Sequence, residues 1–168
     1  DPQLPAPNVK VGDAALLFSL PAVNEDAAMR AVTRTDVAIS DYTGLNPGYP
    51  ARAVVVVFYD KNPGDLSALS RIQKKYQNRG VRVLAVVTGQ SDIATLSNQV
   101  SSQKLEFPVL SDTYGIVASR YGVHGTPMCV LIDNDGFIDA IGMVREDFEL
   151  SMDALLNDLL TTPKTEEQ

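Results

Sequence analysis

Two continuous apolar runs mark the centre of the predicted fold. Residues 52–59 read RAVVVVFY and residues 81–88 read VRVLAVVT, and such β-branched runs are typical of strands buried on both faces. Between them the apolar spacing changes to that of a helix, which Asp65 can cap and Gly80 can end. Its apolar face consists of Leu66, Leu69, Ile72 and Tyr76.

The C-terminal half alternates helices with strands and then forms a hairpin. We expect a helix opened by Ser91 or Asp92, a short extended segment at 107–110, and a helix from Asp112 to about Tyr121. Two further strands, 127–133 and 137–142, are joined by the turn Asn-Asp-Gly, which is a hairpin signal. A last helix begins at 146–147. Strands that alternate with helices and close with a hairpin indicate a mixed sheet covered on both faces.

The N-terminal third is less regular. We expect short strands at 14–20 and 36–40, a helical turn at 24–31, and a Gly- and Pro-rich loop at 41–50. Residues 1–10 contain three prolines and are predicted to form an extended arm, and residues 161–168 to form a polar tail. Between them, residues 11–160 are predicted to form a single domain.

Composition excludes several classes of function. The chain has 168 residues, 45% of them apolar, and a net charge of −7, whereas nucleic-acid binding requires a basic face. The longest unbroken apolar run, 53–59, is too short to span a bilayer. One cysteine and one histidine cannot supply a zinc site or an intrachain disulfide. We therefore predict no cofactor, no metal site, no nucleic-acid partner and no transmembrane segment.

Two charged motifs have ordinary structural interpretations. Asp133, Asn134, Asp135 and Gly136 are similar to the opening of a calcium loop, but the closing Glu is absent and a hairpin turn is favoured. A basic stripe could dock an acidic partner, but a solvated helix face is the commoner meaning. This stripe consists of Arg71, Lys74, Lys75, Arg79 and Arg82.

Six segments, in order, resemble one protein family. They read VGDAALLFSLP, SDYTG, VVVVFY, LSALSRIQKKYQNRGVRVLAVVT, FPVLSDTYGIVASRYGVHGTP and VLIDNDGFIDAIG. Together they resemble the thioredoxin-like redoxins, which include the periplasmic thiol–disulfide oxidoreductases and the AhpC/TSA peroxiredoxins. The resemblance covers 11–160. It implies a three-layer α/β fold with a central mixed sheet flanked by helices and an N-terminal hairpin extension. It also implies that Pro127 is a cis-proline that faces the redox site and helps to bind an extended peptide.

The chemistry of this family is missing from the sequence. The resemblance implies Cys-x-x-Cys, or a peroxide-reducing Cys, at the start of the helix after strand 52–59, where the helix N-terminus lowers a thiol pKa. Residues 60–65 read DKNPGD and contain no Cys, and the segment is shorter than the family's by about one helical turn, ~4 residues. Ser67 is the nearest hydroxyl, and it is not a peroxide-reducing nucleophile.

The lone Cys129 and the lone His124 each have two interpretations. Cys129 alternates with apolar neighbours along PMCVLID, so a buried core residue is favoured over a reactive thiol beside Pro127. His124 could line the groove beside Pro127 or be a plain loop residue, and the loop residue is favoured. The two could form a Cys–His pair, but no third orienting residue is identifiable.

Three functions compete. The first is a redox-inactive thioredoxin-like domain that binds a protein or peptide in a groove. The predicted groove residues are Tyr59, Asn62, Pro63, Asp65, His124, Gly125, Thr126 and Pro127. The second is a thiol-dependent oxidoreductase or peroxidase that uses Cys129 alone. The third is a scaffold in an envelope assembly, in which residues 24–38 contact the partner. The chain start and the resemblance predict a periplasmic or extracytoplasmic location, and the oligomeric state stays open.

Overall fold

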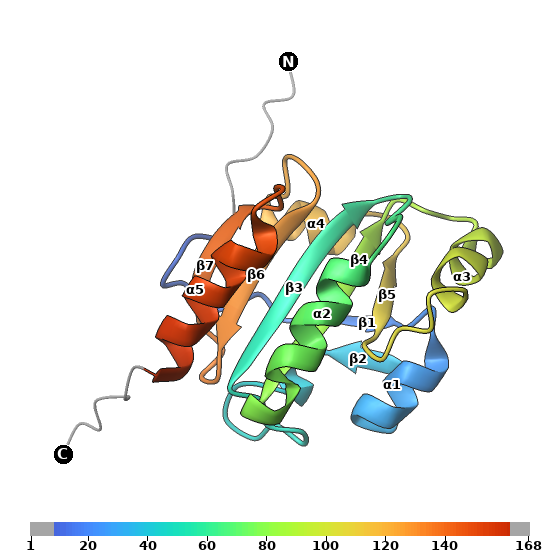
Figure 1. Ribbon diagram of the computed structural model, residues 1–168. Helices are drawn as coiled ribbons and strands as arrows, with labels where there is room; N and C mark the ends of the chain where they lie inside the picture. Colours follow the sequence, from blue (N-terminus) through green and yellow to red (C-terminus); the bar gives the residue numbers. More distant parts are fainter. Residues whose placement is uncertain (1–8, 162–168) are drawn as a thin grey trace.

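A five-stranded mixed sheet forms the centre of the computed structural model, which describes residues 9–161 (Figure 1). The strand order is β5-β4-β3-β6-β7, with β3–β4 and β4–β5 parallel and the other pairs antiparallel. The sheet strands are β3 (Ala53–Asp60), β4 (Val81–Thr88), β5 (Val109–Asp112), β6 (Met128–Asp133) and β7 (Ile138–Met143). This is a thioredoxin-like fold.

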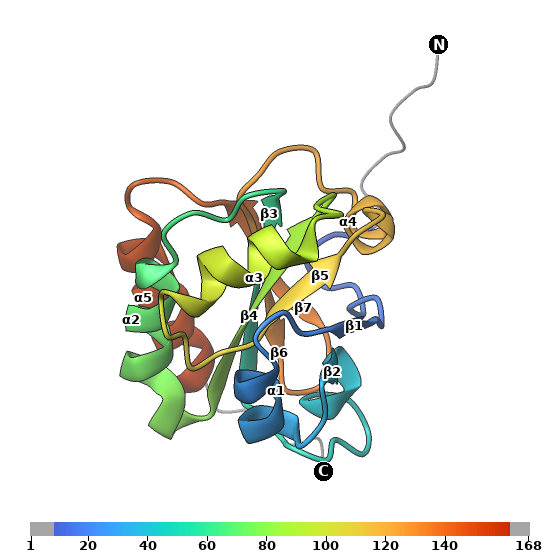
Figure 2. The same ribbon diagram turned by 90° about the vertical axis from the view of Figure 1, so that its right-hand side faces the viewer.

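Helices cover both faces of the sheet (Figure 2). The α-helices are α1 (Glu25–Val32), α2 (Ser67–Tyr76), α3 (Ile93–Ser101), α4 (Ile116–Tyr121) and α5 (Phe148–Thr161). Alternate residues of β3 face opposite layers: Val55 and Val57 pack with α2, α3 and α5, whereas Val54 and Val56 pack with α1 and α4. The β-branched run is buried on both faces because each face meets its own helical layer.

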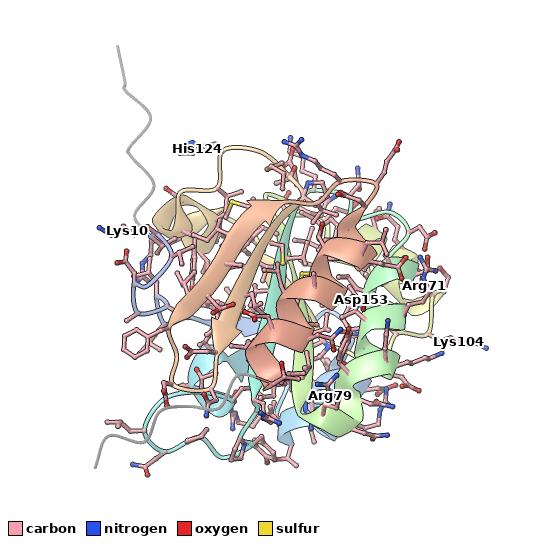
Figure 3. All side chains as sticks on the ribbon, turned by 60° about the vertical axis from the view of Figure 1, so that its left-hand side comes forward. Lys10, Arg71, Arg79, Lys104, His124 and Asp153 are labelled. Carbon is pink, nitrogen blue, oxygen red and sulfur yellow. The ribbon has the colours of Figure 1, made fainter. Side chains whose placement is uncertain are left out.

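Polar side chains join α2 to α5. Arg71 donates to Glu149 at 2.6 Å, Lys75 to Asp153 at 2.9 Å, and Arg79 to the side chain of Asn157 at 3.0 Å. Figure 3 shows Arg71, Arg79 and Asp153 where the two helices meet. Part of the basic stripe is therefore engaged by α5 within the molecule, which leaves less of it for an acidic partner.

The N-terminal region differs most from the sequence prediction. The predicted strand 14–20 is wrong over most of its length, because only β1 (Ser19–Pro21) pairs, antiparallel with β2 (Asp36–Ala38). Ala14 forms an isolated bridge with Phe137, so this segment joins the start of β7 instead. Short 3₁₀ turns cover Ile39–Asp41 and Gln77–Arg79. The predicted arm 1–10 and tail 161–168 lie almost wholly outside the described residues.

Residues 24–38, which the scaffold alternative assigns to a partner, contribute to the core. Ala27, Ala28 and Val32 are buried. The side chain of Asn24 donates to the Phe107 carbonyl at 2.8 Å and accepts from the Val109 N–H at 2.7 Å, which anchors this segment to β5. Within residues 9–161 no helix is long and apolar enough to cross a membrane.

Candidate functional site

The predicted site lies at the end of the sheet where the three parallel strands terminate, which is a different edge from the outer strand β7. Asp60 of β3 is paired with Thr88 of β4, and Thr88 with Asp112 of β5. β6 runs the opposite way, so its first residues meet the end of β3 (Figure 1). In this arrangement the loop before β6 and the connection from β3 to α2 share one edge.

Pro127 lies beside Tyr59 at this edge. The β3–β6 register pairs Phe58 with Met128, and the next step in that register sets Tyr59 opposite Pro127. The Thr126–Pro127 peptide bond is cis, which is the conformation that the resemblance implies. The Pro127 carbonyl accepts a hydrogen bond from the Val144 N–H at 2.9 Å, which ties the start of β6 to the end of β7.

The connection from β3 to α2 is a loop that contains no thiol and is held by hydrogen bonds to other parts of the chain. Its Lys61 N–H donates to the Thr88 carbonyl at 2.8 Å. The Gln103 side chain accepts from the Leu66 N–H and donates to the Gly64 carbonyl, both at 2.8 Å. Helix α2 begins at Ser67 with Leu66 as its N-cap, and the group at its N-terminus is the Asp65 carboxylate, which accepts from the Ser67 N–H at 2.9 Å.

The predicted groove residues are divided between two hollows of the surface. Asp65 lines a hollow of about 330 Å³ together with Gln103 and Lys104. His124 and Gly125 line another, of about 240 Å³, together with Met143. Of the rest, Asn62 and Thr126 are exposed, Pro127 is partly exposed, and Tyr59 and Pro63 are buried. The structure thus brings Tyr59 and Pro127 together and places Asp65 in a different hollow.

Cys129 is enclosed by the layer of α2 and α5. It is 7% exposed, and its Sγ lies 4.0 Å from the Met152 Sδ. Burial raises the pKa of the Cys129 thiol to about 12, so the thiol stays protonated at neutral pH. Burial also raises the pKa of the neighbouring Tyr59, and the nearby Cys129 raises it further. A reactive cysteine needs access and a lowered pKa, and Cys129 has neither.

His124 projects from the loop before β6 and is exposed (Figure 3). It lies five residues before Cys129, which is buried between β6 and α5. An exposed imidazole and an enclosed thiol do not form a nucleophile–base pair in this conformation. In the described part of the chain, residues 9–161, no group of three or more His, Cys, Asp or Glu side chains could hold a metal ion.

Sequence reasoning missed how this edge is stabilised. The buried carboxylate of Asp112 accepts from the Thr88 hydroxyl at 2.6 Å and from the N–H groups of Val117 and Ala118 at 3.2 and 3.0 Å. The sequence predicted Asp112 as a helix cap, but it gave no signal for Thr88. Nothing in the local pattern around Gln103 indicated that it holds the 61–66 loop.

Comparisons with known proteins agree with this architecture. The model of the AhpC/TSA family matches residues 11–144. A putative thiol:disulfide interchange protein DsbE from Chlorobium tepidum is 24% identical, with a TM-score of 0.73, over 90% of this chain and 99% of that one. Peroxidoxin BcpB from Mycobacterium tuberculosis is 18% identical, with a TM-score of 0.67, over 92% and 99%. The search of curated proteins found no match.

Proposed function

The chain belongs to the AhpC/TSA family, and from that premise we propose that it is a redox-inactive thioredoxin-like domain that binds a protein or peptide beside Pro127. One observation carries the proposal. The connection that leads into α2 contains no cysteine, and the only thiol of the chain is buried with a raised pKa. Thiol chemistry therefore has no nucleophile at the edge where the fold would present one.

The surface beside Pro127 has the features of a binding site for an extended segment. Thr126 and His124 are exposed in the loop before β6, and Asn62 is exposed in the β3–α2 connection. Tyr59 forms a buried apolar floor next to Pro127. An extended peptide would pair its backbone with the chain beside Pro127, as an extended segment pairs with an exposed strand. The exposed polar side chains around Pro127 would then select the sequence of the peptide.

Extracytoplasmic location remains part of this proposal. A structural relative from Chlorobium tepidum is a putative thiol:disulfide interchange protein. The similarity to that relative favours the periplasm or the outside of the cell. We propose a protein or peptide partner in that compartment.

A redox assay tests the absence of thiol chemistry. Purified protein is assayed for insulin reduction with dithiothreitol and for peroxide consumption, beside Cys129→Ala. We expect rates equal to background in both proteins. Turnover that disappears in Cys129→Ala would overturn the proposal and would make Cys129 a catalytic thiol, as the one-cysteine alternative requires.

Thiol labelling gives an independent measurement. We expect Cys129 to react with iodoacetamide at pH 8 much more slowly in the folded protein than in denaturant, because burial raises the pKa of its thiol. The control is Thr126→Cys in a Cys129→Ala background, which places a single thiol on the exposed loop and is expected to react in the folded state. Rapid labelling of native Cys129 would show that the pocket around it opens.

A further inference from the structure

The second half of β7 is an unpaired sheet edge. β7 is the last strand of the sheet, and its first half is covered by residues 12–15. The Ile138 N–H donates to the Asp13 carbonyl, and the Ile138 carbonyl accepts from the Gly12 N–H, both at 2.8 Å. Beyond the bulge that follows Ile138, no described residue pairs with the outer side of the strand.

The free backbone groups of this edge belong to Ile141 and Met143. The Val144 N–H donates to the Pro127 carbonyl, and in an antiparallel ladder hydrogen-bonded pairs alternate with pairs that are not. The register pairs Gly142 with Cys129, so Gly142 points its backbone groups at β6. Ile141 and Met143 therefore point their N–H and C=O groups outward.

Two apolar hollows flank this edge, one on each face of the sheet. On the α4 side, a hollow of about 240 Å³ lies between Tyr121, Met128 and Met143. On the α5 side, a hollow of about 180 Å³ lies between Cys129, Phe148 and Leu155. Both include Ile141, Gly142 and Met143 in their walls. An apolar cavity of about 150 Å³ holds a benzene molecule, so each hollow is large enough for a leucine or phenylalanine side chain.

The spacing of the hollows matches a β-strand. Successive side chains of a strand point to opposite faces of its sheet. A strand added along 141–143 would therefore direct one side chain into the α4-side hollow and the next into the α5-side hollow. Gly142 leaves the approach open, because a Cβ atom built there meets nothing within 4 Å.

We propose that the 140–143 edge binds an extended segment of another protein that carries two adjacent, large, uncharged apolar residues. Natural edge strands are usually blocked by charges or proline, and residues 140–143 read AIGM, with neither. No Asp, Glu, Lys or Arg is among the residues that line the two hollows, which excludes a charged side chain from either. The added strand continues the antiparallel pairing that residues 12–15 already make with the first half of β7.

The probe is a panel of blocked hexapeptides. Threonine occupies the four outer positions, and the two central positions carry Leu, Phe, Val, Ser or Lys in all pairs. Backbone amide shifts of the full chain are followed during titration. We expect saturable shifts at Ile141, Gly142 and Met143 with two adjacent apolar residues, and none with Ser-Ser or Lys-Lys. Absence of these shifts with every peptide of the panel would overturn the proposal.

Gly142→Val supplies a variant that fills the site without disturbing the fold. The added side chain has open space and ordinary backbone angles, and it enters the α5-side hollow. We expect the peptide affinity to fall by about tenfold or more, since burial of one leucine contributes roughly that factor. Gly48→Val is the matched control, because that glycine also has open space and lies in a distant loop.

A second pair of variants tests the backbone pairing itself. Met143→Pro removes an outward N–H, whereas Met143→Ala removes only the side chain. We expect the proline variant to bind more weakly than the alanine variant while both keep the parent far-UV spectrum. Equal affinities of the two variants would contradict strand addition.

Other occupants give different results. If the free protein sediments as a dimer that Gly142→Val dissociates, a second copy occupies the edge and the proposal is wrong. Nuclear Overhauser contacts from residues 1–8 to Ile141 in the free protein would contradict it in the same way. The α4-side hollow is also lined by His124 and Gly125 of the proposed binding surface beside Pro127, so the two sites adjoin. Peptide shifts confined to Asn62 and Thr126 would place the peptide on that surface alone and would contradict strand addition at β7.

Discussion

Two strand-to-helix connections lie at the same end of the sheet, on either side of β4, and are stabilised in different ways. The β5–α4 connection is organised by its own buried carboxylate, Asp112, which bonds to the neighbouring strand and to the helix that follows. The β3–α2 connection has an exposed acid, Asp65, and depends on Gln103 from beyond α3. The first connection is stabilised locally, and the second depends on another part of the chain.

The difference shows where the fold tolerates change. In this chain the β3–α2 connection has no cysteine and the sheet is complete, and the buried carboxylate at this end of the sheet is Asp112, in the other connection. We therefore expect substitutions in the β3–α2 connection to destabilise the fold less than substitution of Asp112.

Asp112→Ala is expected to have the largest effect on this comparison. It removes a buried acceptor of three hydrogen bonds and leaves the donors of Thr88, Val117 and Ala118 without it. We expect the free energy of unfolding to fall by about 3 kcal/mol, measured by urea denaturation. Thr88→Val, which deletes only one of the three bonds, should lose less. Equal losses from both would mean that the helix bonds to Asp112 contribute nothing.

Gln103→Ala tests the dependence of the other connection. Two hydrogen bonds, to the Leu66 N–H and the Gly64 carbonyl, are lost from a partly exposed site. We expect a loss of about 1 kcal/mol in global stability and faster amide exchange confined to residues 61–66. Gln99→Ala is the control, because its bond to Asn62 is long, at 3.5 Å. Amide exchange that stays slow in Gln103→Ala would show that residues 61–66 keep their conformation without the hydrogen bonds of Gln103.

The regular elements could be predicted from the sequence, and the long-range ties could not. β4 begins and ends where the apolar run 81–88 does, and Cys129 is buried as its alternation predicts. The strand predicted at 14–20 is wrong over most of its length because Ala14 pairs with Phe137, a partner that no local pattern reveals. At the candidate site, proximity of Tyr59 and Pro127 follows from strand order, whereas the role of Gln103 depends on how α3 packs.

Asp65→Ala is expected to have a smaller effect, visible through its pH dependence. The Ser67 N–H, as a hydrogen-bond donor, lowers the pKa of the Asp65 carboxyl. A carboxyl with a lowered folded pKa stabilises the protein above its unfolded value, near 4, and this contribution disappears as pH falls through the folded value. The variant should be slightly less stable than the parent at pH 7 and equal to it near pH 2. A difference that persists near pH 2 would show that Asp65 acts through packing.

The smallest change, in redox activity, is expected from introducing two thiols into the β3–α2 connection. Asn62→Cys with Asp65→Cys creates Cys-Pro-Gly-Cys in the β3–α2 connection, with the spacing of a redoxin motif. The thiol at position 65 would lie near the Ser67 N–H, whereas the thiol at position 62 precedes α2 by five residues and lies too far from the helix N-terminus to be activated by it. We expect insulin reduction to stay at the parent level. Substantial turnover would contradict this expectation, because it would mean that residues 61–66 can present two thiols as a redox site does.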